Sequence, residues 1–357
     1  MFFAREVHFG KSTPSQPPPA LQGEEAQPTC TSFQGTALEF DLIQRIRQRA
    51  GTRDDVVLGI GDDAALLQPP VGRQLVVAMD ALNAGVHFPV DTAPADIGWK
   101  ALAVNLSDLA AMGAEPAWCT LSLSLPEPDA AWLDAFLDGF LDLADRHRVS
   151  LVGGDTTRGP LSVCVTAHGF VEPGRALRRD GARIGDDVWV TGTLGDAAAA
   201  LSRLLASQGP VAEGESLAAL RSRLDRPAPR VAVGLALAGI AHAAIDVSDG
   251  LLADLGHVAG ASGVGACIEV DRLPASDALR LQYGQHERRA FQAAGGDDYE
   301  LCFTAPQARR EAVARVARAT ATSVTRIGTV LASGGVRAMD ADGGDWRPAR
   351  AGFDHFR

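Results

Sequence analysis

The spacing of apolar and polar residues along the chain predicts alternating helices and strands. Residues 95–113 carry the strongest helix signal, because apolar side chains cover most of the circumference between Pro94 and Gly113. This helix is expected to be largely buried, whereas 129–147 predicts an amphipathic helix. Further helices are predicted near 40–49, 197–207 and 251–261, and strands over 56–60, 74–79, 118–125, 150–152, 161–171, 187–191, 324–330 and 336–339, with one more through 303.

A chain of 357 residues is longer than one that usually folds around a single hydrophobic core, so two domains are expected. Residues 1–36 are rich in proline and small polar residues. We expect a disordered extension there, because such a composition buries too little apolar surface to offset the entropy lost on ordering. The rest divides into residues 37–171 and residues 172–357, at a connection that contains glycine and arginine.

Charge and cysteine content narrow the function classes. The net charge of −11 argues against a nucleic-acid-binding protein, which normally carries clustered basic residues. The five cysteines lie far apart and include no C-x-x-C pair, so neither a disulfide framework nor a zinc knuckle is indicated. A reducing cytoplasm is therefore the expected location. No apolar run reaches the length of a membrane span, about 18 residues, without charges, so no membrane contact is expected.

Four glycine-containing turns carry acidic residues, and this repetition is the main functional signal. They are Gly59-Ile-Gly-Asp-Asp-Ala-Ala65, Gly153-Gly-Asp-Thr-Thr-Arg-Gly159, Ala244-Ile-Asp-Val-Ser-Asp-Gly-Leu251 and Ala294-Gly-Gly-Asp-Asp-Tyr-Glu-Leu301. Glycine lets the backbone approach a ligand, exposed backbone N–H groups can bind phosphate, and carboxylates suit Mg²⁺. One such turn alone is also typical of a polar surface. Four of them favour a shared metal and phosphate site.

Two further aspartates stand in apolar surroundings. Asp80 ends the predicted strand 74–79, and strand ends in α/β folds face ligand crevices. Asp108 lies inside the buried helix, three residues after Asn105. An isolated carboxylate there needs a cation, hydrogen-bond donors or an altered pKa. The alternative is a structural pairing of Asp108 with Lys100 or a backbone group.

Three other features leave alternatives open. His87, in the loop after Asp80, fits either a ligand contact or a surface or capping residue. The arginines within 175–183 fit either a solvated surface or a contact to a triphosphate. The turn Gly192-Thr-Leu-Gly-Asp196 precedes a predicted helix, and it fits either a phosphate-binding loop or an ordinary connection.

Common nucleotide and hydrolase motifs do not occur in the chain. It has no G-x-x-x-x-G-K-[ST] sequence, Rossmann fingerprint, G-x-S-x-G or H-E-x-x-H, so a dehydrogenase, serine hydrolase or zinc protease lacks its usual evidence. The carboxylates that remain are Asp62, Asp63, Asp80, Asp108, Asp155, Asp246 and Asp249. Phosphoryl transfer needs such a set, because Mg²⁺ ions bridge phosphate oxygens and offset the developing negative charge.

Five segments together resemble the thiamine-monophosphate kinases. They are Gly59–Ala65, Lys100–Ala114, Gly153–Gly159, Ile245–Gly250 and Gly295–Leu301. Single motifs are shared with a superfamily that includes aminoimidazole ribonucleotide synthetase and selenophosphate synthetase. The full series, with Gly85–Phe88 and the closing Gly352–Phe356, is specific to the kinases. The resemblance covers about residues 39–356 without large gaps.

The resemblance implies a two-domain, synthetase-like kinase fold of α/β (α+β) class, in which an N-terminal mixed sheet pairs in a homodimer and a C-terminal α/β domain follows. It implies phosphorylation of thiamine monophosphate to thiamine diphosphate by direct in-line transfer from ATP, with several Mg²⁺ ions. The implied metal ligands are Asp63, Asp80, Asp108, Asp155, Asp246 and Asp249. The implied ATP contacts are Gly154, Asp155, Arg179 and Ser248, and the implied substrate contacts are His87, Asp297 and Phe353. No catalytic residue separate from these ligands is implied.

Two positions depart from the family pattern. Ala78 and Met79 stand where related kinases often carry hydroxyl residues, so a metal contact there would use backbone carbonyls. Asp297 stands where glutamate is common, which shortens the reach to the substrate. The alternative functions are another ATP-dependent synthetase of the superfamily and a non-catalytic Mg²⁺-nucleotide sensor.

Overall fold

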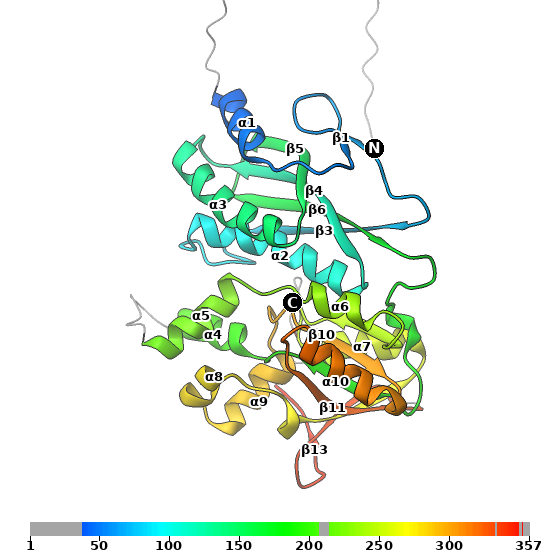
Figure 1. Cartoon of the computed structure of the whole chain (residues 1–357). Coiled ribbons are helices and arrows are strands. Elements are labelled where there is room, and N and C mark those ends of the chain that lie inside the picture. Colours follow the sequence, from blue (N-terminus) through cyan, green and yellow to red (C-terminus); the bar gives the residue numbers. More distant parts are fainter. Residues whose placement is uncertain (1–37, 207–213, 333, 350–351, 353–357) are drawn as a thin grey trace, which may run out of the picture. The chain divides into compact units, whose positions relative to one another are not determined.

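The structure is a computed structural model that describes residues 38–206, 214–332, 334–349 and 352. The chain from Leu38 onward groups into one compact unit (Figure 1). The extension predicted for residues 1–36 lies outside the described residues. Among the helices that are described, none has the length and apolar content needed to cross a membrane.

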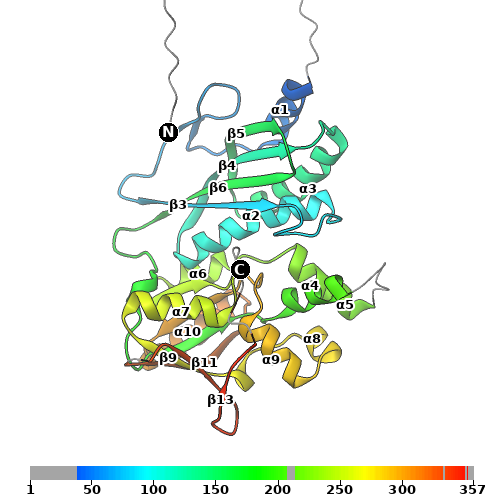
Figure 2. The ribbon, with the colours of Figure 1, turned by 180° about the vertical axis from the view of Figure 1, so that it is seen from behind.

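The first half of the unit is built on a four-stranded sheet with the order β3-β6-β4-β5 (Figure 2). β4 and β5 pair in parallel, and the other neighbours pair antiparallel, so the predicted mixed sheet is confirmed. β1 and β2 form a separate two-stranded sheet. The elements are α1 (Leu38–Arg49), β1 (Val56–Leu58), β2 (Leu66–Leu67), β3 (Gln74–Asn83), α2 (Pro94–Ala111), β4 (Glu115–Leu125), α3 (Ala130–Arg146), β5 (Ser150–Arg158) and β6 (Ser162–Val171).

The two helices α2 and α3 pack against each other on this sheet (Figure 1). Both lie close to their predicted spans, and Asp129 caps α3 by accepting hydrogen bonds from the first backbone N–H groups. Glycines allow the backbones to touch. A Cβ on Gly98 would lie 2.0 Å from the carbonyl oxygen of Phe136, and a Cβ on Gly139 would lie 1.7 Å from that of Ala95. Any larger residue at either glycine would force the helices apart.

Two strands extend beyond their predicted ends. β3 continues through Asp80 to Asn83, because Asp80 pairs with Val165 and Asn83 with Ser162 of β6. Asp80 therefore lies inside a strand, which corrects the prediction that it stands at a strand end. β5 continues through residues 153–158, where a turn was predicted, because these residues pair with β4. Backbone hydrogen bonds to a neighbouring strand here outweigh the turn preference of glycine and aspartate.

The second half of the unit is built on a seven-stranded sheet with the order β13-β12-β9-β11-β7-β10-β8, which confirms the predicted α/β class. Its strands are β7 (Asp187–Thr191), β8 (Ala243–Asp246), β9 (Gly265–Glu269), β10 (Leu301–Ala305), β11 (Val324–Leu331), β12 (Val336–Met339) and β13 (Asp345–Trp346). Its helices are α4 (Asp196–Ala206), α5 (Glu215–Asp225), α6 (Val231–Leu237), α7 (Leu251–Ser262), α8 (Asp277–Gln282), α9 (Gln285–Ala294) and α10 (Arg310–Ala319). The sequence did not predict α5, α6, α8, α9 and α10, which are short or rich in charged residues.

The largest core cluster joins the two halves through α2. Leu102 and Leu106 of α2 belong to the same buried cluster as Phe303 of β10. α2 also contacts α6 so closely that a Cβ on Gly234 would lie 2.0 Å from the carbonyl oxygen of Ala110. One helix thus packs on both sheets, and this places its polar side chains beside the end of β8.

Candidate active site

A cavity of about 620 Å³ lies where α2 and β3 meet the end of β8 and the segment before β10; we call it the acidic cavity. Seven of the predicted site residues line it: Asp80, His87, Asp108, Asp246, Ser248, Asp249 and Asp297. Its apolar lining includes Val86, Val104, Leu201, Leu205 and Phe291. The fold thus gathers residues that lie more than two hundred positions apart in the chain, such as Asp80 and Asp297, around one cavity.

The carboxylates of Asp80, Asp108 and Asp246 act on one another electrostatically within this cavity. Burial, helped by the charges of Asp246 and Asp80, raises the pKa of Asp108 to about 8. Burial raises the pKa of Asp246 to about 6, although a hydrogen bond from Ser107 acts in the opposite direction. The pKa of Asp80 is also raised by burial. A cation bound among these groups would relieve both their repulsion and their loss of solvent.

The turn after β8 is organised by Asp254, a residue that the sequence analysis did not select. Its Oδ2 accepts hydrogen bonds from the backbone N–H groups of Ser248 (3.1 Å), Asp249 (3.2 Å) and Gly250 (3.1 Å). Burial raises the pKa of Asp254 to about 7. An acidic residue four positions after a turn glycine, at the start of a helix, was the available signal. Asp254 therefore fixes the turn that carries Ser248 and Asp249.

His87 and Asp297 lie at another part of the acidic cavity. The backbone N–H of Asn83 donates to Nδ1 of His87 over 3.0 Å, so the proton of a neutral imidazole sits on Nε2. The hydroxyl of Tyr299 donates to Oδ1 of Asp297 over 3.1 Å. Asp297 and Tyr299 have positive φ angles of 67° and 50°, a conformation that non-glycine residues rarely adopt outside functional sites. The sequence analysis did not single out Tyr299.

Four other predicted residues lie elsewhere. Gly154 and Asp155 line a smaller cavity of about 90 Å³, together with Ile43 and other apolar residues. Asp63 is exposed in the loop between β1 and β2, where its backbone N–H donates to Asp62. Arg179 is exposed next to the connection between the halves, and its charge opposes the rise in the pKa of Asp108. Asp63 and Asp155 are therefore not among the residues that line the acidic cavity.

Phe353 lies outside the described residues, but Gly352 is described. A Cβ on Gly352 would lie 3.0 Å from the carbonyl oxygen of Asp249, so the chain at Gly352 passes beside the turn after β8. Trp346 of β13 is partly buried and packs against a hydrophobic cluster that includes Ile268 and Ala338.

The donor set of the acidic cavity fits Mg²⁺ better than a soft metal, because its polar groups present oxygen. Within the described ranges, no three His, Cys, Asp or Glu side chains stand close enough together to hold one ion by themselves. Mg²⁺ is usually held by one or two carboxylates together with water and substrate phosphates. Carboxylates spaced around a cavity match this mode, in which a phosphate supplies the remaining ligands.

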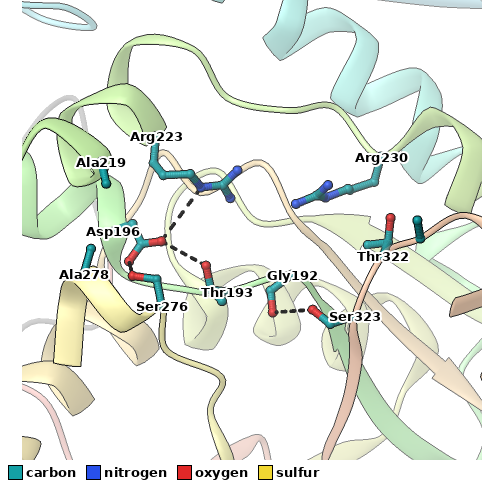
Figure 3. A pocket seen from close by; sticks show the side chains of 11 residues that line it. Gly192, Thr193, Asp196, Ala219, Arg223, Arg230, Ser276, Ala278, Thr322 and Ser323 are labelled. Atoms are coloured by element: carbon teal, nitrogen blue, oxygen red, sulfur yellow. Dashed lines mark hydrogen bonds and ion pairs between the residues drawn. The ribbon is translucent and has the colours of Figure 1, made fainter. Parts of the chain in front are cut away.

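The turn from Gly192 to Asp196 borders a separate cavity of about 370 Å³ (Figure 3). Its backbone N–H groups are already used inside the protein, since Gly195 donates to Asp298 and Leu194 to the carbonyl of Pro274. Arg223 and Arg230 of this cavity both pair with the buried Glu300. These contacts favour an ordinary connection between β7 and α4 over a phosphate-binding loop.

Comparisons with known proteins agree with this fold. The chain matches two protein families, "AIR synthase related protein, N-terminal domain" over residues 61–171 and "AIR synthase related protein, C-terminal domain" over residues 183–341. It is 47% identical over 323 residues to a thiamine-monophosphate kinase of Escherichia coli K12, covering 89% of this chain and 98% of that protein. These two matched ranges lie on either side of the predicted boundary at residue 172.

Solved structures give the same result. The crystal structure of a thiamine-monophosphate kinase from Stenotrophomonas maltophilia shares 57% identity at a TM-score of 0.80, covering 85% of this chain and 96% of that one. A structure of AaThiL complexed with AMPPCP and TMP shares 33% identity at a TM-score of 0.71, covering 91% of this chain and 100% of that one.

Proposed function

Because the chain belongs to the thiamine-monophosphate kinase family, we propose that it transfers the γ-phosphoryl group of ATP in line to thiamine monophosphate, with Mg²⁺ ions held by carboxylates of the acidic cavity. As a member of this family the chain is a kinase. The observation that carries the proposal is the convergence of Asp80, Asp108 and Asp246 in a cavity that also contains His87 and Asp297.

The proposed reaction joins two phosphate groups. An oxygen of the thiamine monophosphate phosphate forms a bond to Pγ of ATP while the bond from Pγ to the bridging oxygen breaks, and ADP leaves. The second proton of a phosphate monoester has a pKa of about 6. The attacking phosphate oxygen of thiamine monophosphate is therefore already ionised at neutral pH. The chain therefore needs no general base. We accordingly assign no catalytic residue apart from the metal and nucleotide ligands.

The main task of the protein is to place two anions in line with each other. Bound Mg²⁺ would supply the positive charge that offsets both sets of phosphate oxygens. Asp80, Asp108, Asp246 and Asp249 would hold the ions, while Asp63 and Asp155 are retained as ligands on the family resemblance alone. Ser248, Gly154 and Arg179 are the proposed ATP contacts. The charge of Arg179 already acts on Asp108 and Asp246, which supports a position near the phosphates.

The thiamine moiety is proposed to bind at the part of the cavity near His87 and Asp297. Its thiazolium ring carries a positive charge, which favours a carboxylate and an aromatic face. Asp297 offers the carboxylate, and Phe291 offers an aromatic side chain in the lining. Phe353 is retained as a substrate contact on the family resemblance alone. The structure of AaThiL complexed with AMPPCP, an ATP analogue, and TMP supports the same pair of substrates here.

A homodimer that pairs through the N-terminal sheets is proposed from the family resemblance, and the surface of β3 supports it. Leu75, Val77 and Met79 project from one face of this edge strand and are 51%, 54% and 64% exposed. Contiguous apolar side chains on an open sheet face mark an association surface. A second copy of the chain would cover them. We also propose a cytoplasmic location, since Cys119, Cys164, Cys267 and Cys302 are free thiols.

One assay tests the proposed function. The purified chain is incubated with ATP, Mg²⁺ and thiamine monophosphate, and thiamine diphosphate and ADP are measured together. We expect both products in equal amounts, and none after chelation with EDTA until Mg²⁺ is added back. ADP without thiamine diphosphate would point to another acceptor. Nucleotide binding with no turnover would favour the Mg²⁺-nucleotide sensor and contradict the proposal.

A further inference from the structure

Lys100 is a buried lysine that the proposed chemistry does not use. It lies in the first half of α2, and its side chain is only 2% exposed. Its Nζ donates to the carbonyl oxygen of His87 over 3.0 Å and lies 3.4 Å from Oδ1 of Asp297. A buried ammonium group is costly without partners, so these two contacts account for its burial. Both partners line the acidic cavity.

The two partners of Lys100 belong to different halves of the protein. His87 lies in the loop between β3 and α2, where its backbone N–H donates to the carbonyl oxygen of Asn83. Asp297 lies between α9 and β10, where its backbone N–H donates to the carbonyl oxygen of Ser248. Lys100 is thus a direct polar link between the two segments that contribute the proposed substrate contacts.

The geometry at Asp297 leaves one oxygen for a ligand. Lys100 and the hydroxyl of Tyr299 both approach Oδ1. In the part of the chain that the structure describes, Oδ2 receives no side-chain or backbone donor. The carboxylate is 28% exposed, so Oδ2 can face a ligand while Oδ1 is held. Two donors on one oxygen restrict rotation of the carboxylate, which matters because an aspartate reaches less far than a glutamate.

We propose that Lys100 is a positioning residue that holds His87 and Asp297 in place for the cationic ring of the substrate. This inference rests on the proposed function, because it assigns a role in the binding of thiamine monophosphate. Lys100 itself does not line the acidic cavity, whereas its partners His87 and Asp297 do, so its loss should weaken substrate binding more than turnover. A purely structural lysine would instead affect folding and both substrates alike.

The first test replaces Lys100 by methionine, which keeps most of the length and removes the charge and the donors. We expect KM for thiamine monophosphate to rise about tenfold or more, while kcat and KM for ATP change less than about threefold. Lys100→Arg keeps the charge and should recover part of the loss. Arg310→Met is the matched control, because Arg310 pairs with Asp187 outside the acidic cavity, and it should leave both KM values unchanged.

A second test asks whether Lys100 acts through Asp297. In a double-mutant cycle, Lys100→Met, Asp297→Asn and the double variant are compared by the dissociation constant of thiamine monophosphate, measured calorimetrically with AMPPCP present. We expect the effects of the two substitutions to be less than additive, because in the double variant the loss of Lys100 acts only through His87. If the methionine variant does not fold, Lys100→Gln, which keeps one donor, takes its place in both tests.

The two hypotheses fail in different ways. Unchanged KM for thiamine monophosphate, equal changes for both substrates, or additive effects with Asp297→Asn would overturn the role of Lys100 while the kinase assignment stands. A wild-type protein that makes no thiamine diphosphate would overturn the proposed function, and the positioning role of Lys100 with it.

Discussion

The hydroxyl of Ser107, in α2, donates a 2.7 Å hydrogen bond to Oδ2 of Asp246, the last residue of β8. Both residues are buried, and they are separated by 139 positions in the chain. Ser107 precedes Asp108, so one helix carries both a proposed metal ligand and the donor that orients another. The bond lowers the pKa of Asp246 against the larger, opposite effect of burial.

Replacing Ser107 by alanine should therefore weaken the metal site without unfolding the protein. Asp246 would lose its donor and its fixed orientation, and partners of metal ligands commonly change metal affinity by about 10–100-fold. We expect the Mg²⁺ concentration for half-maximal activity to rise by about tenfold. Ser202→Ala, which removes an exposed hydroxyl from the lining of the same cavity, is the control and should behave like the wild type. An unchanged Mg²⁺ dependence in Ser107→Ala would show that the bond does not serve the metal.

Replacing Asp108 by alanine should abolish turnover while the fold is kept. Asp108 lies in the acidic cavity with Asp80 and Asp246, and its loss removes a proposed ligand of the Mg²⁺ that would offset the phosphate charge. We expect kcat to fall by about 100-fold or more, with circular dichroism and melting behaviour preserved. The variant loses a buried, repelled carboxylate, so it should be at least as stable as the wild type without metal. Full activity would remove Asp108 from the proposed ligands.

The exposed apolar face of β3 gives a test of the homodimer. Val77 is 54% exposed and pairs across the sheet with His168 of β6. Val77→Glu would place a charge on this face, and we expect a dimer to become a monomer in sedimentation or light-scattering measurements. Leu281→Glu changes an equally apolar and 75% exposed residue of α8, and it should leave the association state as it was. A wild-type monomer at micromolar concentration would contradict the dimer.

The ion pairs of Asp187 with Arg310 and Arg326 allow a prediction of how the folding stability of the protein depends on pH. Its carboxylate is fully buried in β7, and burial alone would raise its pKa, but hydrogen bonds from Arg310 and Arg326 outweigh this and hold the pKa below its usual value. A lowered pKa in the folded state means that the stabilisation is present above the unfolded-state pKa and is lost as pH falls through the folded-state pKa.

We therefore expect Asp187→Asn to lower the free energy of unfolding by about 2 kcal/mol at pH 7. The difference from the wild type should begin to shrink as pH falls below the unfolded-state pKa of about 3.9, and it should vanish once pH is below the lowered folded-state pKa, because Asp187 is then protonated in both states. Denaturant unfolding at several pH values measures this. Asp345→Asn removes an exposed ion pair with Arg337 and should change stability little at any pH. A difference for Asp187→Asn that is independent of pH would refute the electrostatic explanation.

The sequence predicted elements best where the local signal was strong and repeated. The helix from Pro94 to Ala111 was found because its apolar residues cover nearly the whole circumference and its ends carry Pro94 and Gly113. The C-terminal ends of β3 and β5 were not predicted, because the local sequence places Asp80 at a strand end and Gly153 in a turn. The strands β6 and β4 supply backbone partners that no local pattern reveals.

In the candidate site, too, some features could be predicted from the local sequence and others depend on contacts that only the structure shows. The repetition of acidic glycine turns was enough to predict Mg²⁺ and phosphate chemistry, because carboxylates suit Mg²⁺ and exposed backbone N–H groups suit phosphate. The Mg²⁺ ions remain a prediction. The roles of Ser107, Asp254 and Lys100 could not be read from the chain, since a serine, an aspartate and a lysine in a helix have many ordinary explanations. Ser107 is identified by its contact with Asp246, 139 positions away, Lys100 by its contacts with His87 and Asp297, and Asp254 by three hydrogen bonds from the turn just before it.

The sequence by itself therefore determined which chemical groups this protein offers to a ligand, because residue types and their spacing limit what a site can bind. Only the tertiary structure decided which of those residues meet. It brought Asp80, Asp108 and Asp246 to one cavity and left Asp63 and Asp155 outside it, because α2 packs on both sheets and carries Asp108 to the end of β8. Such packing depends on contacts between residues far apart in the chain, which local patterns do not encode.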